Sequence, residues 1–291
     1  MSENLQLPTQ AVNEWLKRAT AELAAVGIPS ARLDAELILA HTIRQSRTYL
    51  HAHPDEIITE RQEEIANARI ELRKDFVPVA YIIGHKEFYG RRFRVTNATL
   101  VPRPESESII ELLATVIPQE ARSLRDNPLR LVDVGTGSGI LGITAKCEYP
   151  ELDVTLLDIS RHALAVAEEN AAALGVTVSC VQSDLLGNYP LTADIIVANL
   201  PYVDPSWERN KETEHEPEQA LFAKQDGLAL IRELIIQSRS QLRMGGWMIL
   251  EADSRQHEKI IQFAKENGLV PVQTEGFALL VQKLTTQFPR D

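Results

Sequence analysis

The chain has 291 residues, of which 44% are hydrophobic and 24% charged, a composition typical of a folded protein with an ample core. Its formal net charge of -11 argues against a protein whose main task is to grip nucleic acid, which needs clustered Lys and Arg. It lacks an apolar run of about 18 residues and a signal-peptide pattern, so we expect a cytoplasmic protein without membrane association. Its cysteines and histidines lack the spacing of metal ligands, so no metal site is predicted.

Residues 1–75 are predicted to form a small bundle of amphipathic helices. Apolar residues recur at helical spacing in residues 12–24 and again in residues 33–40. Thr59 and Gln62 have the spacing of a capping box, which predicts the start of a further helix. Because this region carries no catalytic constellation, we interpret it as a domain that recognises a partner.

Residues 76–100 are predicted to form a β-hairpin linker. The apolar stretch 77–83 and the aromatic stretches at Phe88 and Phe93 suggest two strands around a turn. In the segment 101–105, which has the sequence Val-Pro-Arg-Pro-Glu, each proline constrains the residue before it. We therefore expect a stiff, extended segment there, followed by a helix.

From residue 130 onward, apolar strands alternate with helical stretches, which is the pattern of a parallel sheet built from βαβ units. Strands are predicted at residues 130–134, 153–157, 176–181, 194–197 and 247–251, with a closing hairpin near residues 270 and 278. The sequence thus predicts an α/β domain with a sheet of about seven strands.

A glycine-rich loop directly follows the first of these strands. It consists of Gly135, Thr136, Gly137, Ser138 and Gly139. Glycines at this place let the backbone approach a ligand closely and let the next helix begin tight against the strand. Gly137, Gly139 and Gly142 also spell G-x-G-x-x-G, so a nicotinamide-binding domain is an alternative. Against it, Asp133 lies where a negative charge disfavours a pyrophosphate and suits a cationic ligand such as S-adenosylmethionine.

Carboxylates also follow the next two strands. Asp158 ends the second strand, where it can accept hydrogen bonds from both hydroxyls of a ribose. Asp184 follows the third strand, where its carboxylate can accept a hydrogen bond from the amino group of an adenine. With the adjacent Leu185, these residues complete the predicted cofactor site.

The fourth strand runs into Asn199, Leu200, Pro201 and Tyr202. Open α/β sheets have their active sites at such strand ends. The Asn199 side-chain oxygen and the Leu200 carbonyl, whose direction Pro201 restricts, are two acceptors suited to one NH2 group. Tyr202 offers a flat surface for a planar substrate. The motif thus predicts a site for a planar nitrogen nucleophile, which favours methyl transfer over hydride transfer; an ordinary turn is the alternative.

Together these motifs resemble the class I S-adenosylmethionine methyltransferases. More narrowly, they resemble the HemK/PrmC family, which methylates the side-chain amide nitrogen of a glutamine in peptide chain release factors. The resemblance covers nearly the whole chain and includes residues 30–37, Glu87–Phe88, 101–105, 133–139, 199–202, Glu216–Pro217 and 226–228. It implies a Rossmann-like seven-stranded sheet, with a helical recognition domain at 1–75, a hairpin linker at 76–100 and a methyltransferase domain at 101–291.

The resemblance also implies roles for residues of the site. Asn199, Leu200, Pro201 and Tyr202 are the expected catalytic and substrate-binding residues, with Arg103 as a further substrate contact. Asn199 is also expected to border the cofactor. The implied partner is a release factor, free or on the ribosome. We also expect a monomer and, from the acidity of the chain, no direct contact to nucleic acid.

One residue departs from the family pattern, because the family usually has Pro at the position of Leu200. Asn-Leu-Pro-Tyr instead resembles the ribosomal RNA adenine dimethyltransferases, which also methylate a planar amino group. The acidity of the chain and its domain order favour a protein substrate over RNA. The alternatives are a glutamine of a large-subunit ribosomal protein and an adenine N6 of ribosomal RNA.

Overall fold

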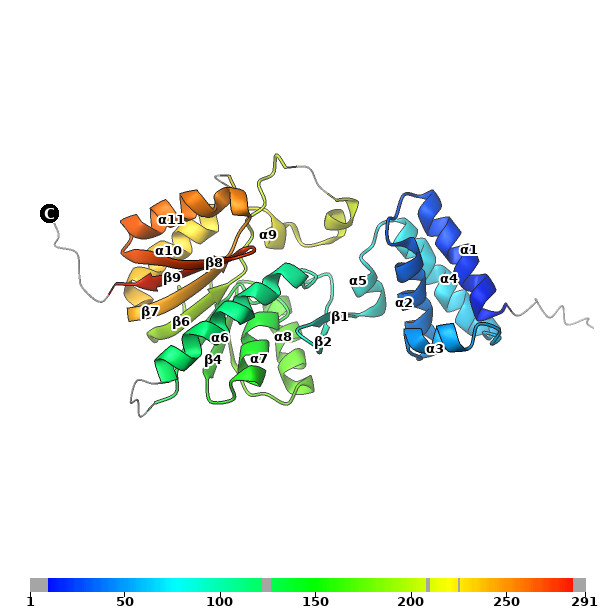
Figure 1. Cartoon of the computed structure of the whole chain (residues 1–291), viewed down its shortest axis with the longest axis horizontal. Coiled ribbons are helices and arrows are strands. Elements are labelled where there is room, and N and C mark those ends of the chain that lie inside the picture. Colours follow the sequence, from blue (N-terminus) through cyan, green and yellow to red (C-terminus); the bar gives the residue numbers. More distant parts are fainter. Residues whose placement is uncertain (1–9, 122–126, 208–209, 225, 285–291) are drawn as a thin grey trace, which may run out of the picture. The chain divides into compact units, whose positions relative to one another are not determined.

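The structure is a computed structural model that describes residues 10–121, 127–207, 210–224 and 226–284 (Figure 1). The chain divides into two compact units. The helical unit consists of Met1–Gly84 and Asn210–His215, and the sheet unit consists of His85–Arg209 and Glu216–Asp291. Residues 1–9 of the predicted helical domain lie outside the described residues.

The helical unit confirms the helices expected from the apolar spacing. Its elements are α1 (Val12–Ala25), α2 (Ala31–Ile43), α3 (Arg47–Ala52), α4 (Glu60–Lys74), α5 (Val79–Ile83) and the 3-10 helix η2 (Lys211–His215). The predicted capping box is present, because Thr59 accepts from the Gln62 amide and the Gln62 side chain accepts from the Thr59 amide. Apolar side chains from α1, α2 and α4, including the fully buried Trp15, form the core of this unit.

A buried arginine ties the segment Asn210–His215 into the helical unit. The Arg73 side chain is 2% exposed, and its Nε donates to Asp34 Oδ2 at 2.7 Å. Its Nη2 donates to Glu212 Oε1 at 2.5 Å. A buried guanidinium needs such compensation, because burial of an unpaired charge costs several kcal/mol, on the order of 3–5. Glu212 is therefore anchored among the helices of this unit.

The prediction of a strand at residues 77–83 is wrong, because Val79–Ile83 is the short helix α5. Pro78 is its N-cap, and Gly84 ends it in the left-handed conformation with φ 77°. These two residues outweigh the β-branched composition between them. The hairpin that follows is shorter than expected and pairs β1 (His85–Phe88) with β2 (Arg91–Arg94).

The sheet unit contains the predicted seven-stranded sheet, in the order β5-β4-β3-β6-β7-β9-β8. The strands are β3 (Arg130–Val134), β4 (Asp153–Asp158), β5 (Ser179–Gln182), β6 (Ala193–Ala198), β7 (Leu242–Glu251), β8 (Leu269–Glu275) and β9 (Ala278–Lys283). The first five strands in this order are parallel, and β9 is antiparallel to both β7 and β8. The closing hairpin is thus confirmed.

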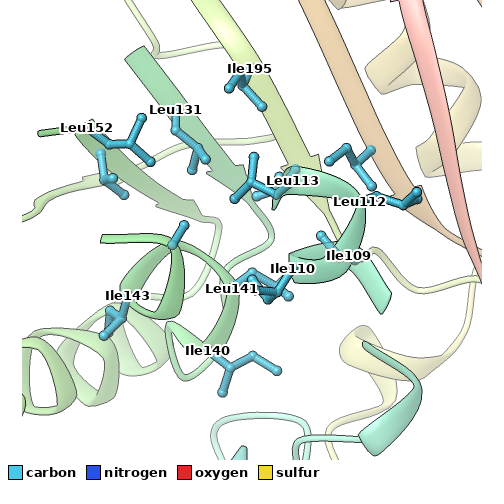
Figure 2. Packing of buried hydrophobic residues seen from close by; sticks show 14 of the residues in the cluster. Ile109, Ile110, Leu112, Leu113, Leu131, Ile140, Leu141, Ile143, Leu152 and Ile195 are labelled. Atoms are coloured by element: carbon cyan, nitrogen blue, oxygen red, sulfur yellow. The ribbon is translucent and has the colours of Figure 1, made fainter. Parts of the chain in front are cut away.

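Helices cover both faces of this sheet. The longer ones are α6 (Glu107–Ala121), α7 (Ile140–Glu148), α8 (Arg161–Ala173), α10 (Ala229–Gln241) and α11 (His257–Glu266), and the short ones are η1 (Pro104–Ser106), α9 (Glu218–Leu221) and η3 (Ser254–Gln256). On one face, Leu131 and Ile195 pack with side chains of α6 and α7 (Figure 2). The alternate residues Val132 and Ile196 pack on the other face with α10 and α11. This period-two division explains why the central strands are apolar throughout.

The strand order places the ends of β3 and β6 side by side. Chain connections leave β3 on one side toward β4 and β6 on the other toward β7, so the sheet has its topological switch point between them. Val134 pairs with Ala198 in register, so the glycine loop and Asn199 leave the sheet together. Ligands of open α/β sheets bind at this position. No helix in the described ranges is long and apolar enough to cross a membrane.

Candidate active site

The buried carboxylate of Asp133 supports the glycine loop. Its Oδ2 accepts from Thr136 Oγ1 at 2.6 Å and from the Gly142 amide at 2.9 Å. The Gly142 amide lies in the first turn of α7, where helix amides lack partners within the helix. The other oxygen, Oδ1, is buried without a hydrogen-bond partner among the described residues. This oxygen can therefore accept a further hydrogen bond.

Burial raises the pKa of Asp133 to about 6, while the Thr136 hydroxyl and the Gly142 amide oppose the rise. The nearby charge of Asp158 adds to it. A positive group near Oδ1 would relieve this destabilisation of the carboxylate, and an anionic group would worsen it. The electrostatics of the loop therefore fit a cationic ligand better than a pyrophosphate.

The glycines of this loop have different tasks. A Cβ added at Gly139 would lie 2.4 Å from Ile143 Cδ1, and one at Gly142 would lie 2.3 Å from Leu156 Cδ2. These two glycines are needed for the close packing of α7. Gly137 has φ 55°, and a Cβ there would meet nothing within 4 Å, so this part of the loop borders open space. That space fits a ligand lying against the backbone.

The two polar side-chain positions within the loop hold it in shape. Thr136 is buried, and its hydroxyl is directed at Asp133. Ser138 is buried as well, and its carbonyl accepts from Asn170 Nδ2 of α8 at 2.8 Å. Both residues therefore fix the loop backbone.

Asp158 joins the end of β4 to the glycine loop. Its Oδ2 accepts from the Gly137 amide at 2.9 Å, and its Oδ1 accepts from the Ser160 amide at 2.8 Å. Each carboxylate oxygen has a second lone pair, so the group can still accept from ribose hydroxyls. Asp184 is exposed, and the buried Leu185 has a left-handed backbone with φ 47°, a strained conformation typical of functional sites. Pairing of β5 with β4 brings them to the same sheet edge.

These residues form what we call the cofactor side: Asp133, Gly135, Thr136, Gly137, Ser138, Gly139, Asp158, Asp184 and Leu185. They fit S-adenosylmethionine, because the unpartnered Asp133 oxygen suits its cationic part and Asp158 suits its ribose. Among the described residues, no three or more His, Cys, Asp or Glu side chains gather as a metal site.

Asn199 follows β6 and is held by a serine from far along the chain. Its Nδ2 donates to Ser106 Oγ at 3.0 Å, and Ser106 is fully buried at the end of η1. Within the described part of the chain, no donor bonds to Asn199 Oδ1 or to the Leu200 carbonyl. The two acceptors expected from the sequence therefore keep their lone pairs free of donors from the described residues.

Tyr202 is anchored by a carboxylate at the end of the neighbouring strand. Its hydroxyl donates to Oε1 of Glu251 at 3.0 Å, and Glu251 is 1% exposed. Burial raises the pKa of Tyr202, and the charge of Glu251 raises it further, so the phenol keeps its proton. The ring is half-buried and packs against the core cluster that contains Val132 and Ile196. Tyr202 is therefore fixed from both ends.

The backbone of Tyr202 is held by two further residues. Gln256 Nε2 donates to the Tyr202 carbonyl at 2.9 Å and to the Asp226 carbonyl at 2.8 Å. Gly227 has φ 80°, and a Cβ there would lie 2.0 Å from the Tyr202 carbonyl oxygen. The Asp226–Gly227 turn therefore needs its glycine for a close approach to Tyr202.

The structure accounts for leucine at position 200. The Leu200 side chain is 4% exposed and belongs to the core cluster that includes Val134 and Ala198. A Cβ added at Gly135, which has φ 71°, would lie 2.7 Å from Leu200 Cδ2. Leu200 therefore fills space directly against the glycine loop and joins the two loops of the site.

Arg103 bonds to a buried carboxylate of the same unit. Its Nη2 donates to Glu216 Oε1 at 2.7 Å and to Oε2 at 2.9 Å, and the Glu216 side chain is 0% exposed. The pair ties the segment before α6 to the start of the Glu216–Pro217 segment. Arg103 was predicted as a substrate contact, and in the structure its charge compensates Glu216.

Three residues of the site were not predicted from the sequence, namely Ser106, Glu251 and Gln256. Together with Asn199, Leu200, Pro201 and Tyr202 they form what we call the acceptor side. Glu251 had a usable signal, because it ends an apolar strand as Asp158 does. Ser106 and Gln256 had none, because each acts on a residue distant in the sequence.

Comparison with known proteins agrees with this geometry. A family model described as PrmC N-terminal domain matches residues 14–84, and one described as Methyltransferase small domain matches residues 110–281. A release factor glutamine methyltransferase of Koribacter versatilis is 37% identical, over 80% of this chain and 83% of the relative. One of Aliivibrio fischeri is 31% identical, over 91% of this chain and 92% of the relative.

Among solved structures, the hMettl16 catalytic domain in complex with MAT2A 3'UTR hairpin 6 is similar with a TM-score of 0.51. The match is 13% identical and covers 80% of this chain and 86% of that chain, so it concerns the fold alone. The matches to both family models and to relatives of nearly equal length go further. The chain belongs to the family of release factor glutamine methyltransferases, with S-adenosylmethionine as the methyl donor.

Proposed function

We propose that this enzyme methylates the side-chain amide nitrogen of a glutamine in a peptide chain release factor. The observation that carries this proposal is the pair of acceptors beside the cofactor side, Asn199 Oδ1 and the Leu200 carbonyl, to which no donor of the described residues bonds. A primary amide offers two hydrogens to such a pair. The names of the relatives from Koribacter versatilis and Aliivibrio fischeri support the release factor as the protein that carries the glutamine.

The residues of the acceptor side supply positioning. An amide nitrogen is a weak nucleophile because its lone pair is delocalised into the carbonyl group, and no side chain deprotonates it at neutral pH. When bound, S-adenosylmethionine would supply the electrophilic methyl group, its sulfur would keep the electrons of the broken bond to that methyl group, and the methylated nitrogen would release one proton to solvent. Asn199 Oδ1 and the Leu200 carbonyl each accept one amide hydrogen, which orients the nitrogen and excludes water from it. Pro201 restricts the direction of the Leu200 carbonyl, and Tyr202 packs against the glutamine side chain.

The residues of the cofactor side bind the methyl donor. Asp133 would face its cationic part, Asp158 would accept from its ribose hydroxyls, and Asp184 with Leu185 would border its adenine. The backbone of the glycine loop lies against it at Gly137. Arg103 contributes to the substrate surface indirectly, because it holds Glu216 and with it the loop that follows Tyr202.

We further propose a division of labour along the chain. Residues 1–75 recognise the release factor, residues 76–100 connect the two domains, and residues 101–291 form the methyltransferase domain. The net charge of -11 supports a protein substrate without direct contact to nucleic acid. The enzyme acts in the cytoplasm as a monomer, on a release factor that is free or bound to the ribosome. Light scattering of the purified protein tests the monomer.

A label-transfer assay tests the substrate. Purified enzyme and methyl-labelled S-adenosylmethionine are offered a release factor, a large-subunit ribosomal protein and naked ribosomal RNA in parallel. We expect label in the release factor, mapped to one glutamine by mass spectrometry. A release factor with asparagine in place of that glutamine is the matched control and should remain unlabelled. Label in the RNA or in the ribosomal protein alone would contradict the proposal.

A further inference from the structure

Side chains from three distant segments converge on the acceptor side. Ser106 comes from η1, Tyr202 from the loop after β6, and Glu251 from the end of β7. Asn199 Nδ2 donates to Ser106 Oγ at 3.0 Å, and the Tyr202 hydroxyl donates to Glu251 Oε1 at 3.0 Å. Ser106 and Glu251 are both at most 1% exposed. The proposed reaction uses Asn199 and Tyr202, but it assigns no role to the buried carboxylate of Glu251.

One of the two carboxylate oxygens of Glu251 accepts no hydrogen bond from the described residues. This oxygen is Oε2, and it is buried. A buried acceptor without a partner is unfavourable, and it is more so when the group is charged. Burial raises the pKa of Glu251 above its ordinary value and the charge of Glu105 adds to the rise, while the polar groups of Ser106, Tyr202 and Asn199 oppose it. Ala198 of β6 pairs with Leu250 of β7 in parallel register, so the next residue along each chain segment, Asn199 and Glu251, lies beside the other.

We propose that Glu251 is a positioning residue for methyl transfer, whose carboxylate keeps the Asn199 amide turned with Nδ2 toward Ser106 and Glu251 and with Oδ1 toward the substrate. The proposal rests on the role proposed above for Asn199. It adds Ser106 as the second group that holds the same amide.

The physical reason lies in the symmetry of an amide side chain. Rotation of Asn199 by half a turn about its terminal bond would exchange Oδ1 and Nδ2 with little change in shape. In that orientation Nδ2 would face the NH2 group of the substrate, and Oδ1 would face a carboxylate. An ionised carboxylate only accepts hydrogen bonds, so Glu251 disfavours this orientation. A neutral glutamine at position 251 carries an NH2 group as well as an oxygen and would permit it.

The first variant is therefore Glu251→Gln, which keeps the size of the side chain. We expect kcat to fall by roughly 10- to 100-fold, as for a misplaced reactive group, while the Kd for S-adenosylmethionine stays near the wild-type value. Asp194→Asn is the matched control, because Asp194 is a buried carboxylate at the opposite end of β6, bonded to Arg243. This control should keep wild-type kcat.

The second step repeats Glu251→Gln in an Asn199→Ala background, with single-turnover rates measured at excess enzyme. If Glu251 acts through the Asn199 amide, its substitution should cost less than about twofold once that amide is gone. Ser106→Ala gives an independent measurement, because it removes the other partner of Nδ2. Its effect should combine with that of Glu251→Gln less than additively.

The outcomes separate this inference from the proposed function. Wild-type kcat in Glu251→Gln, or an equal loss with and without Asn199, would overturn the positioning role and leave the role of Asn199 standing. Wild-type turnover in Asn199→Ala would overturn the proposed role of Asn199 and this inference with it. A loss that depends on Asn199, at unchanged cofactor affinity, is the result we expect.

Discussion

The cofactor side and the acceptor side of this site are built in different ways. On the cofactor side, carboxylates at the strand ends bind backbone amides close by, as Asp133 does with Gly142 and Asp158 with Gly137 and Ser160. On the acceptor side, side chains meet from distant segments. Asn199 and Ser106 are 93 residues apart, and Tyr202 and Glu251 are 49 apart.

The difference teaches how each side can fail. A local motif shapes the cofactor side, so a single substitution there should weaken binding and leave the rest of the site in place. The acceptor side depends on loops held by Gln256, Gly227 and Glu216, so it is sensitive to changes remote from the reacting atoms. Cofactor affinity and turnover should therefore respond to separate sets of residues.

The largest effect is expected from Asn199→Ala. Loss of one of the two acceptors leaves the substrate amide free to rotate, and a misplacement of about 1 Å can cost on the order of 100-fold in rate. Single-turnover transfer should fall by that order, while calorimetry should show nearly unchanged cofactor affinity. Wild-type turnover would remove Asn199 from the acceptor side.

Gly227→Ala should have the next largest effect on turnover. We expect a loss of roughly tenfold if the Tyr202 backbone moves by a fraction of about 1 Å. A Cβ there would lie 2.0 Å from the Tyr202 carbonyl oxygen. Gly268→Ala is the matched control, because Gly268 has φ 81°, close to the 80° of Gly227, with nothing within 4 Å of an added Cβ. Both variants carry a left-handed backbone strain of about 1–2 kcal/mol, and thermal denaturation should show a further loss only in Gly227→Ala, from the close approach to the Tyr202 backbone. Equal turnover in the two variants would contradict the contact with Tyr202.

Asp158→Asn should weaken cofactor binding by about tenfold, because it removes a charged acceptor for the ribose hydroxyls. At saturating cofactor, kcat should remain near the wild-type value. Asp153→Asn, at the exposed other end of β4, is the control and should leave the Kd unchanged. Calorimetric titration measures both, and an unchanged Kd in Asp158→Asn would exclude the ribose role.

The effect of pH is the smallest near neutral pH and grows only in acid. Burial raises the pKa of Asp133 to about 6 in the free protein, so the carboxyl is protonated below that pH and ionised above it. A cationic ligand favours the ionised form, so cofactor affinity should be constant above about pH 7 and fall as pH drops through 6. The fall should reach roughly tenfold per pH unit, since one unit corresponds to about 1.4 kcal/mol. In Asp133→Asn this acid limb should disappear; its persistence would point to another group.

The same contrast explains what the sequence predicts. The parallel sheet followed from apolar strands that alternate with helical stretches, and the ligand loop followed from the glycines next to Asp133, because these signals are local. Asn199 and the turn at Gly227 were also visible as motifs. The partners Ser106 and Gln256 were not, because their bonds to Asn199 and Tyr202 exist only after the chain has folded.

The error at residues 79–83 has a similar origin. A short apolar run of Val, Tyr and Ile suits a strand or a helix equally, and its ends decide between them. Pro78 and Gly84 act as helix caps, which a count of apolar residues does not weigh. Leu200 shows the reverse case, where an unusual residue is explained by packing against Gly135 and the core.

The most direct test of two separable sides is a double-mutant cycle between Asn199→Ala and Asp158→Asn, read out as kcat/KM for S-adenosylmethionine with a release factor as acceptor. The separable account predicts that the two losses multiply, with an interaction free energy within about 0.5 kcal/mol of zero. An interaction of about 1 kcal/mol or more, in either direction, would show that the two sides act as one unit and would contradict the account.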